Sequence, residues 1–322
     1  MQKELVDFNI STSSIDLHDQ CPFRWAHKNV YKTEVPPQPI KNYTVVGNAF
    51  HKLMEEFYIQ GAKTGNWSSK WLVANWEKIL KLEAKGKITK DCFEGTTGGY
   101  DSKTIFYELL NKGYTNKDGH ILKTIEKLEI DERYLKYHDA IKEVIEKELE
   151  KTKFELTRWE TINGFSMIKK VYPMLVDHNW LRPPATVDKK IAVEFWFDFP
   201  YEGHDKYIAK AWGKIDLMIL DDNEVPHILD WKTGKNSIDT VEESVQAIFY
   251  SAGLWKKFNL REEAIHFIYP QLDFVKSFLV EDGHYAIIRK KINAMFDSYH
   301  KKKYEKKENS NCKYCEFQHL CK

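Results

Sequence analysis

The sequence contains no long hydrophobic run. Apolar residues make up 42% of its 322 residues, yet no segment approaches the roughly 18 consecutive apolar residues of a membrane-spanning helix. The first residues, Met1 to Glu4, also lack the positive segment and apolar stretch of a signal peptide. We therefore expect a folded cytoplasmic protein without a membrane partner, long enough to bury a substantial core in one or two domains.

Net charge is low as well. The chain has 49 Lys and Arg against 48 Asp and Glu, a formal net charge of +1, whereas binding of nucleic-acid phosphates depends on clustered positive charge. The basic residues are not evenly spread. A cluster near the C-terminal end consists of Arg289, Lys290, Lys291, Lys301, Lys302, Lys303, Lys306 and Lys307. On charge alone, a solvated helix face explains such a run more often than a DNA-binding surface does.

Cysteine is scarce, with five residues in the chain. In a reducing compartment such thiols are more often metal ligands or free groups than disulfides. Cys21 stands near the start, Cys312, Cys315 and Cys321 form a C-x2-C-x5-C run, and Cys92 has no thiol neighbour. Four thiolates suit a soft metal centre. A site made of these four would require the two ends of the chain to meet.

The pattern of residues predicts helices first and strands later in the chain. Ser11 to Ser14 provide N-cap residues for a short helix that stops at Cys21-Pro22. An apolar stripe predicts an amphipathic helix from Thr44 to Gly61. The remaining expected elements are a helical insertion at 62–185, strands at 191–197, 211–220, 227–231, 264–269 and 277–280, and helices at 241–258 and 283–307. No internal repeat is visible.

Two carboxylates and a lysine on the expected strands indicate a site for phosphodiester chemistry. Asp216 and Asp230 lie on neighbouring strands joined by a turn, which can bring them together, and Mg²⁺ prefers oxygen ligands. Lys232 lies two residues beyond Asp230 and should point to the same face, where it can orient water or offset developing charge. An isolated Asp-x-Lys is nevertheless common by chance. Glu194, on the preceding strand, is more simply an exposed carboxylate than an outer metal group.

A longer ordered series gives this motif its meaning. Four short segments follow one another along the chain: Gly47 to His51, Gly213 to Asp216, Asp230 to Gly234 and Gln246 to Tyr250. Their order resembles that of the RecB-like branch of the PD-(D/E)XK nucleases. With the cysteines added, the resemblance is closest to the iron-sulfur members, which include the CRISPR-associated spacer-acquisition exonuclease and the nuclease domain of AddB-type subunits. It implies an α/β fold in which a mixed central sheet is flanked by helices.

The resemblance also implies roles for individual residues. His51 would join Asp216 and Asp230 as a metal ligand, although a helical histidine is by itself more often structural, and an imidazole ligand makes Mn²⁺ as suitable as Mg²⁺. Gln246 and Tyr250 are four apart on one helix face and would contact substrate or position the catalytic groups.

Cys21, Cys312, Cys315 and Cys321 would, by the same resemblance, hold a [4Fe-4S] cluster. Chemistry also permits zinc on these four thiolates, or a Cys3His zinc site in which His319 replaces Cys21.

These expectations combine into one functional hypothesis. Residues 1–61 would carry the first cysteine and the histidine helix, 62–185 the insertion, and 186–322 the nuclease core with the other cysteines. We expect a metal-dependent DNA exonuclease acting on single-stranded or duplex ends in repair, recombination or DNA acquisition, with a helicase or recombination protein as a candidate partner. A structure-specific endonuclease and a non-catalytic iron-sulfur DNA-binding subunit remain alternatives. The sequence does not set the polarity or the oligomeric state.

Overall fold

The computed structural model describes most of the chain. It covers residues 4–35, 41–85, 102–112, 114–115, 120, 138–151, 156–203, 207–234, 240, 242–262 and 264–321. These form two compact units, the first with Met1–Pro36, Glu55–Trp67 and Lys170–Lys322, and the second with Pro37–Met54 and Ser68–Lys169. Cys92 lies outside the described residues.

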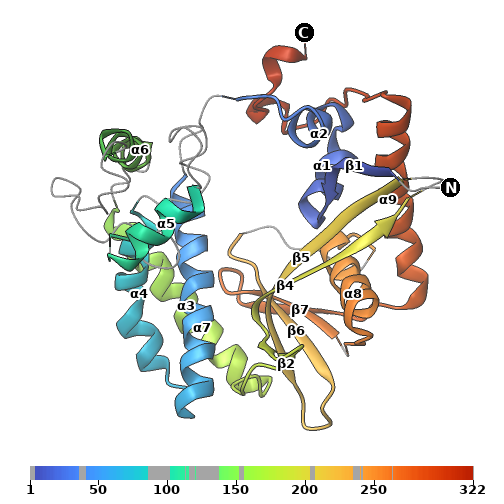
Figure 1. The fold of residues 1–322 in the computed structure, drawn as a ribbon. Helices are drawn as coiled ribbons and strands as arrows, with labels where there is room; N and C mark the ends of the chain where they lie inside the picture. Colours follow the sequence, from blue (N-terminus) through green and yellow to red (C-terminus); the bar gives the residue numbers. More distant parts are fainter. Residues whose placement is uncertain are drawn as a thin grey trace. The chain divides into compact units, whose positions relative to one another are not determined.

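A six-stranded mixed sheet forms the centre of the first unit (Figure 1). Its strands are β1 (Glu4–Ile10), β4 (Val193–Glu202), β5 (Tyr207–Leu220), β6 (Pro226–Trp231), β7 (Ala264–Tyr269) and β8 (Phe274–Phe278). The order is β1-β5-β6-β7-β8, with β4 also paired to β5. The β1/β5 and β6/β7 pairs are parallel and the others antiparallel. The short strands β2 (Thr186–Val187) and β3 (Lys190–Ile191) pair separately. This arrangement confirms the predicted mixed sheet.

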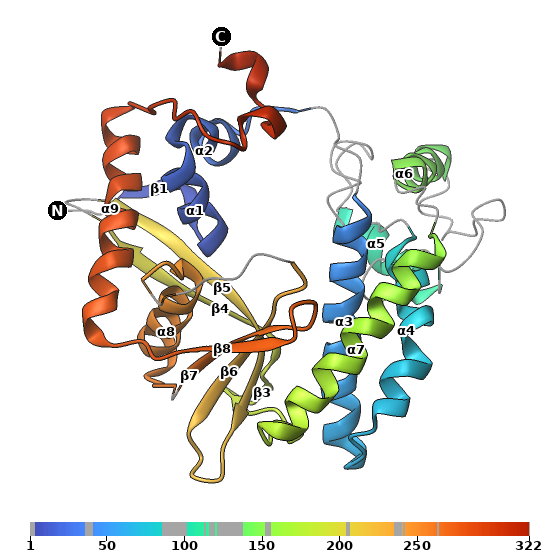
Figure 2. The ribbon, with the colours of Figure 1, turned by 180° about the vertical axis from the view of Figure 1, so that it is seen from behind.

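The sheet is flanked by helices that bury its apolar side chains. These are α1 (Thr12–Gln20), α2 (Pro22–Asn29), α8 (Val245–Phe258) and α9 (Tyr285–Lys301). α8 packs against β4 and β5, and α9 packs against α8 and α1 (Figure 2). On β4, Phe195, Phe197 and Phe199 are buried while Trp196 and Asp198 are exposed, the alternation of a strand with one covered face. α8 therefore covers one face of the sheet.

Three expected boundaries are corrected by local hydrogen bonding and backbone geometry. α8 begins at Val245 because the Ser244 hydroxyl caps it by accepting the Ala247 N–H at 3.1 Å. α9 ends at Lys301 because Lys302 adopts a left-handed φ of 49° and its N–H bonds back to the last turn. β8 covers Phe274–Phe278 because its ladder with β7 begins at that first residue. Half of the basic run therefore lies beyond the helix.

Helices make up most of the described part of the second unit. α4 (Ser69–Glu83), α5 (Ser102–Asn111) and α6 (His138–Lys151) belong to it, while α3 (Asn42–Thr64) and α7 (Arg158–Asp177) contribute residues to both units. Trp76 is fully buried and its indole N–H donates to the Thr161 carbonyl at 3.0 Å. A Cβ on Gly164 would lie 1.9 Å from that indole, so glycine permits the close approach.

The expected boundaries of the insertion, after residues 61 and 185, remain a prediction. Across the described residues, no helix combines the length and the apolarity that crossing a bilayer would require.

Candidate active site and cysteine cavity

Asp216 and Asp230 lie beside each other at the point where β5 and β6 separate. Leu217 pairs with Leu229 in the antiparallel ladder, so the next step of the register places Asp216 next to Asp230. The two residues are only 7% and 2% exposed. Asp216 Oδ2 accepts the backbone N–H of Trp231 at 2.8 Å, which fixes this carboxylate across the strand gap. The structure thus brings the two predicted carboxylates together.

Lys232 and Gln246 form a polar network with Asp230. The Lys232 ammonium forms an ion pair with Asp230 Oδ2 and donates to Gln246 Oε1. It also lies 4.2 Å from the centre of the Phe267 ring, a cation-π contact. The lysine is therefore held by three neighbours, and its charge is directed toward Asp230.

The Gln246 amide has one orientation that satisfies its neighbours. Its Nε2 donates to Asp230 Oδ1 at 2.8 Å and to Tyr250 Oη at 2.6 Å, while its oxygen accepts from Lys232. Tyr250 Oη in turn donates to the Lys214 carbonyl at 2.5 Å. Burial, together with the charges of Asp230 and Asp216, raises the pKa of Tyr250 well above its usual value. Tyr250 therefore stays a neutral phenol that anchors α8 to β5.

Glu194 is part of this site, contrary to the expectation of an exposed strand carboxylate. Its side chain is 18% exposed and forms an ion pair with Lys214. One of its carboxylate oxygens lies within 4.8 Å of one of Asp216. The backbone at Glu194 has a φ of 50°, a left-handed conformation that strand patterns do not reveal. The sequence signal for Glu194 is its place on the strand that precedes Asp216 and Asp230.

The carboxylates fit a hard divalent cation. Glu194 and Asp216 lie on the adjacent strands β4 and β5, between the pairs Val193–Leu217 and Phe195–Ile215, with carboxylate oxygens within 4.8 Å of each other. Two carboxylates this close repel each other, and a cation between them would offset that repulsion. Oxygen ligands of this kind suit Mg²⁺ and Mn²⁺. His51 lies on α3 in the second unit and is partly buried; its role as a further ligand remains a prediction.

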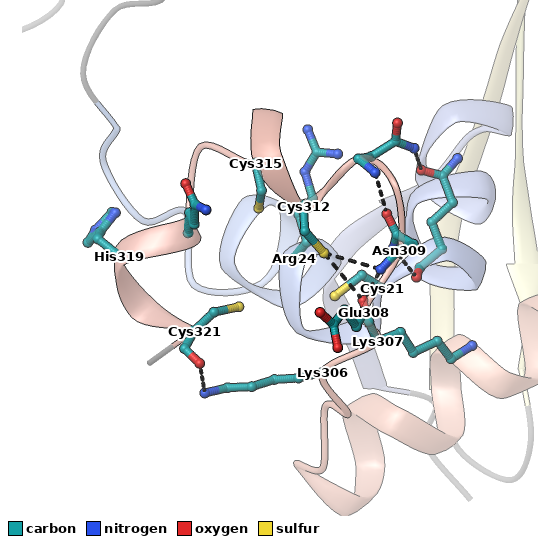
Figure 3. A pocket seen from close by; sticks show the side chains of 13 residues that line it. Cys21, Arg24, Lys306, Lys307, Glu308, Asn309, Cys312, Cys315, His319 and Cys321 are labelled. Atoms are coloured by element: carbon teal, nitrogen blue, oxygen red, sulfur yellow. Dashed lines mark hydrogen bonds between the residues drawn. The ribbon is translucent and has the colours of Figure 1, made fainter.

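The four cysteines at the two ends of the chain line one cavity of about 720 Å³ (Figure 3). Cys21 precedes α2, and the others lie in two short 3-10 turns, η5 (Cys312–Tyr314) and η6 (Gln318–Leu320), or directly after them. All four are free thiols. The Cys312 sulfur accepts the Asn309 N–H at 3.3 Å. We call this feature the cysteine cavity.

Polar contacts join the two ends around the cysteine cavity. Arg24 forms an ion pair with Glu316 at 2.6 Å. The Phe23 N–H donates to the Glu305 carbonyl at 3.1 Å, and the Lys307 ammonium donates to the Asp19 carbonyl at 2.9 Å. Both ribbon views place α1 and α2 next to the C-terminal segment (Figures 1 and 2). The fold itself therefore holds the distant cysteine near the other three.

Comparison with known proteins places this geometry in a family. The model of the PD-(D/E)XK nuclease superfamily matches residues 9–101 and 105–322. The chain belongs to the PD-(D/E)XK nuclease superfamily. Members are metal-dependent nucleases, so membership implies a hydrolase that uses divalent metal and acts on DNA.

The other comparisons add little to this assignment. No curated protein matches the chain. Among solved structures, one titled "Crystal structure of SSO0001" aligns at 15% sequence identity with a TM-score of 0.30, covering 59% of this chain and 80% of that one. The family assignment therefore rests on the family model.

Proposed function

We propose that the chain is a DNA exonuclease of the RecB-like, iron-sulfur branch of this superfamily. It would hydrolyse phosphodiester bonds from single-stranded or duplex ends in repair, recombination or DNA acquisition. The proposal is carried by one unit that combines a carboxylate-lysine network with a cavity lined by four cysteines from both ends of the chain. The resemblance seen in the sequence links that combination to exonucleases.

The residues of the network divide the work of hydrolysis. Asp216 and Glu194, whose oxygens lie close together, would hold the divalent cation, with Asp230 and His51 as further ligands by family resemblance. When bound, the cation compensates the charge of the phosphoryl group and assists the attacking water and the leaving oxygen. Lys232 orients that water and offsets the charge that develops on phosphorus. Gln246 holds Lys232 and Asp230 in fixed positions, because its amide oxygen accepts from Lys232 and its amide nitrogen donates to Asp230.

Family resemblance favours an iron-sulfur cluster over zinc in the cysteine cavity. Four thiolates from Cys21, Cys312, Cys315 and Cys321 line it, and both a [4Fe-4S] cluster and a structural zinc ion take four such ligands. His319 lines the same cavity (Figure 3), so a Cys3His zinc site on Cys312, Cys315, Cys321 and His319 is the alternative that metal analysis tests.

Cleavage assays test the catalytic proposal. Linear end-labelled DNA and covalently closed circles are incubated with wild type and with Asp216→Ala, Asp230→Ala or Lys232→Ala, in Mg²⁺ and in Mn²⁺. We expect degradation from a terminus, intact circles, and a loss of about 100-fold or more in each variant. Asp198→Ala is the matched control, because that carboxylate is exposed and forms an ion pair with Lys210 at 3.0 Å, away from this network.

Two results would replace this proposal by an alternative. Rapid cutting of single-stranded circles would identify an endonuclease. DNA binding without cleavage in either metal would identify a non-catalytic subunit.

A further inference from the structure

Two tryptophans form a stacked pair on the sheet. The rings of Trp196 on β4 and Trp212 on β5 lie with their centres 5.0 Å apart and their planes at 22°. Trp196 is 60% exposed, although it is among the largest apolar side chains of the unit. We call Trp196 and Trp212 the aromatic platform.

The aromatic platform shares a sheet face with the carboxylates. Side chains alternate along β5, so Trp212, Lys214 and Asp216 point to one face. Trp196 is the cross-strand partner of Lys214. At about 3.3 Å per residue, the backbone positions of Trp212 and Asp216 are about 13 Å apart, which is at most about four stacked nucleotides of one DNA strand. A DNA strand held at the carboxylates therefore reaches the platform.

Lys214 links the two features by charge. Its ammonium forms an ion pair with Glu194 and lies 5.9 Å from the centre of the Trp196 ring. The platform thus has a positive group on the side that leads toward the carboxylates. Aromatic rings flanked by lysine are the usual elements of surfaces that bind single-stranded nucleic acid.

Sheet packing alone does not explain the exposure of Trp196. Cross-strand aromatic pairs do stabilise sheets, but the core beneath β4 is already supplied by Phe195, Phe197 and Phe199 on the opposite face. A ring that leaves most of its surface in water gains little from burial. Its open face is available for stacking by a flat partner.

We propose that the aromatic platform stacks unpaired bases of single-stranded DNA next to the cleavage site, and so gives the enzyme a preference for single strands. This inference rests on the proposed nuclease function. Every base has a ring face and can stack without sequence readout, whereas in a duplex the neighbouring base pairs cover those faces. The platform therefore distinguishes strandedness and not sequence.

Binding measurements with Trp196→Ala test the proposal. Fluorescence anisotropy follows labelled oligothymidylate of about 20 nucleotides, and a blunt duplex of the same length, without divalent metal. We expect Trp196→Ala to bind the single strand about tenfold more weakly and the duplex within about twofold of wild type. Trp196→Phe should recover most of the affinity. The slope of affinity against salt should stay unchanged, because stacking releases no counterions.

Trp255→Ala is the matched control. Trp255 is 41% exposed on α8, where it stacks under Arg261 at 4.3 Å instead of lying on the carboxylate face. Wild-type affinity of Trp196→Ala for the single strand, an equal loss for the duplex, or no binding of oligothymidylate by wild type would overturn the inference. Failure of the nuclease proposal gives a different result: wild type would bind DNA in this assay but would not cut it in the cleavage assay.

Discussion

At the scale of single residues, the site depends on groups that hold others in place. Gln246 uses its acceptor for Lys232 and both donors for Asp230 and Tyr250. A lysine next to a buried carboxylate would otherwise be free to adopt other rotamers. The amide fixes Lys232 relative to Asp230, because only one orientation of Gln246 lets its oxygen accept from the lysine while its nitrogen donates to the carboxylate. Gln246 therefore holds Lys232 in place beside Asp230, which makes it a positioning residue under the proposed function.

Removing that amide should impair cutting without unfolding the protein. We expect Gln246→Leu to lower the cleavage rate by about 10- to 100-fold, the usual cost of losing an outer contact at a metal site, and to raise the metal concentration needed for half-maximal rate. Tyr285→Phe is the control, since Tyr285 bonds Ser251 elsewhere on α8 at 2.7 Å. A normal metal requirement in Gln246→Leu, with a reduced melting temperature, would point to a purely structural role.

Buried histidines should make the protein sensitive to acid. Burial, with smaller contributions from His227 and His178, lowers the pKa of His266 to about 3. Burial and the charge of Lys307 lower the pKa of His18 to about 4. Both groups are neutral when folded and bind protons more readily when unfolded. Their contribution to stability is therefore complete above about pH 6.5 and is lost as the pH falls toward the folded pKa.

Urea unfolding at two pH values measures this effect. From the His266 shift alone, we expect the free energy of unfolding to fall by about 2 kcal/mol between pH 7 and pH 5. In His266→Gln, which keeps a hydrogen-bonding side chain opposite Ser277, this part of the fall should disappear, and the part due to His18 should remain. A stability independent of pH in wild type, or an equal fall in the variant, would contradict the assignment.

At the scale of elements, the approach of α8 to the sheet depends on two glycines. A Cβ on Gly253 would lie 2.1 Å from the Phe197 ring, and one on Gly213 would lie 2.4 Å from it. The ring of Phe197 therefore lies against a bare backbone on both sides. This close packing sets the depth of α8, and with it the reach of Gln246 toward Asp230.

Gly253→Ala should separate α8 from the sheet. Alanine favours a helix over glycine by about 1 kcal/mol, but overpacking costs about 1–3 kcal/mol, so we expect a net loss of stability in urea unfolding. Cleavage should fall as well, because Gln246 moves with the helix. Gly283→Ala is the control, since nothing lies within 4 Å of its added Cβ. Combining Gly253→Ala with Phe197→Leu should restore part of the stability; no recovery would show that the ring is not the obstacle.

The sequence predicts those elements whose signal is local. The strand Ala264–Tyr269 is buried throughout and matches its expected bounds. β1 was not predicted, although Val6, Phe8 and Ile10 alternate into the core, because its parallel pairing with β5 lies some 200 residues away. The end of α9 depends on a left-handed lysine within a uniformly basic run. Such a run has no residue that marks a helix end.

The site shows the same division. Family order and strand alternation predicted that Asp216, Asp230, Lys232, Gln246 and Tyr250 would gather, and the structure brings them together. The sequence predicted an exposed Glu194. That prediction is wrong because the backbone has a positive φ at Glu194, which the alternation of a regular strand does not reveal. Local residue patterns do not predict contacts that depend on an unusual backbone conformation or on pairing between strands far apart in the sequence.

At the scale of the whole chain, the two ends meet through contacts that need no metal. Lys291 pairs with Asp19, the Lys307 ammonium donates to the Asp19 carbonyl at 2.9 Å, and His18 bonds Ser298 at 3.0 Å. A metal group bound in the cysteine cavity would add to this closure, because ligands far apart in sequence converge only in the folded state. Loss of the group should therefore lower stability without abolishing the fold.

Anaerobic purification tests the cysteine cavity. A [4Fe-4S] cluster predicts a brown protein with about four irons per chain. Alanine at Cys21, Cys312, Cys315 or Cys321 should lower both iron content and melting temperature, since each removes a ligand. Cys92→Ala is the control and should keep both. Stoichiometric zinc without iron would replace the cluster by a structural zinc site. Full metal loading in Cys21→Ala would mean that the C-terminal residues bind the metal alone, and that only the polar contacts hold the two ends together.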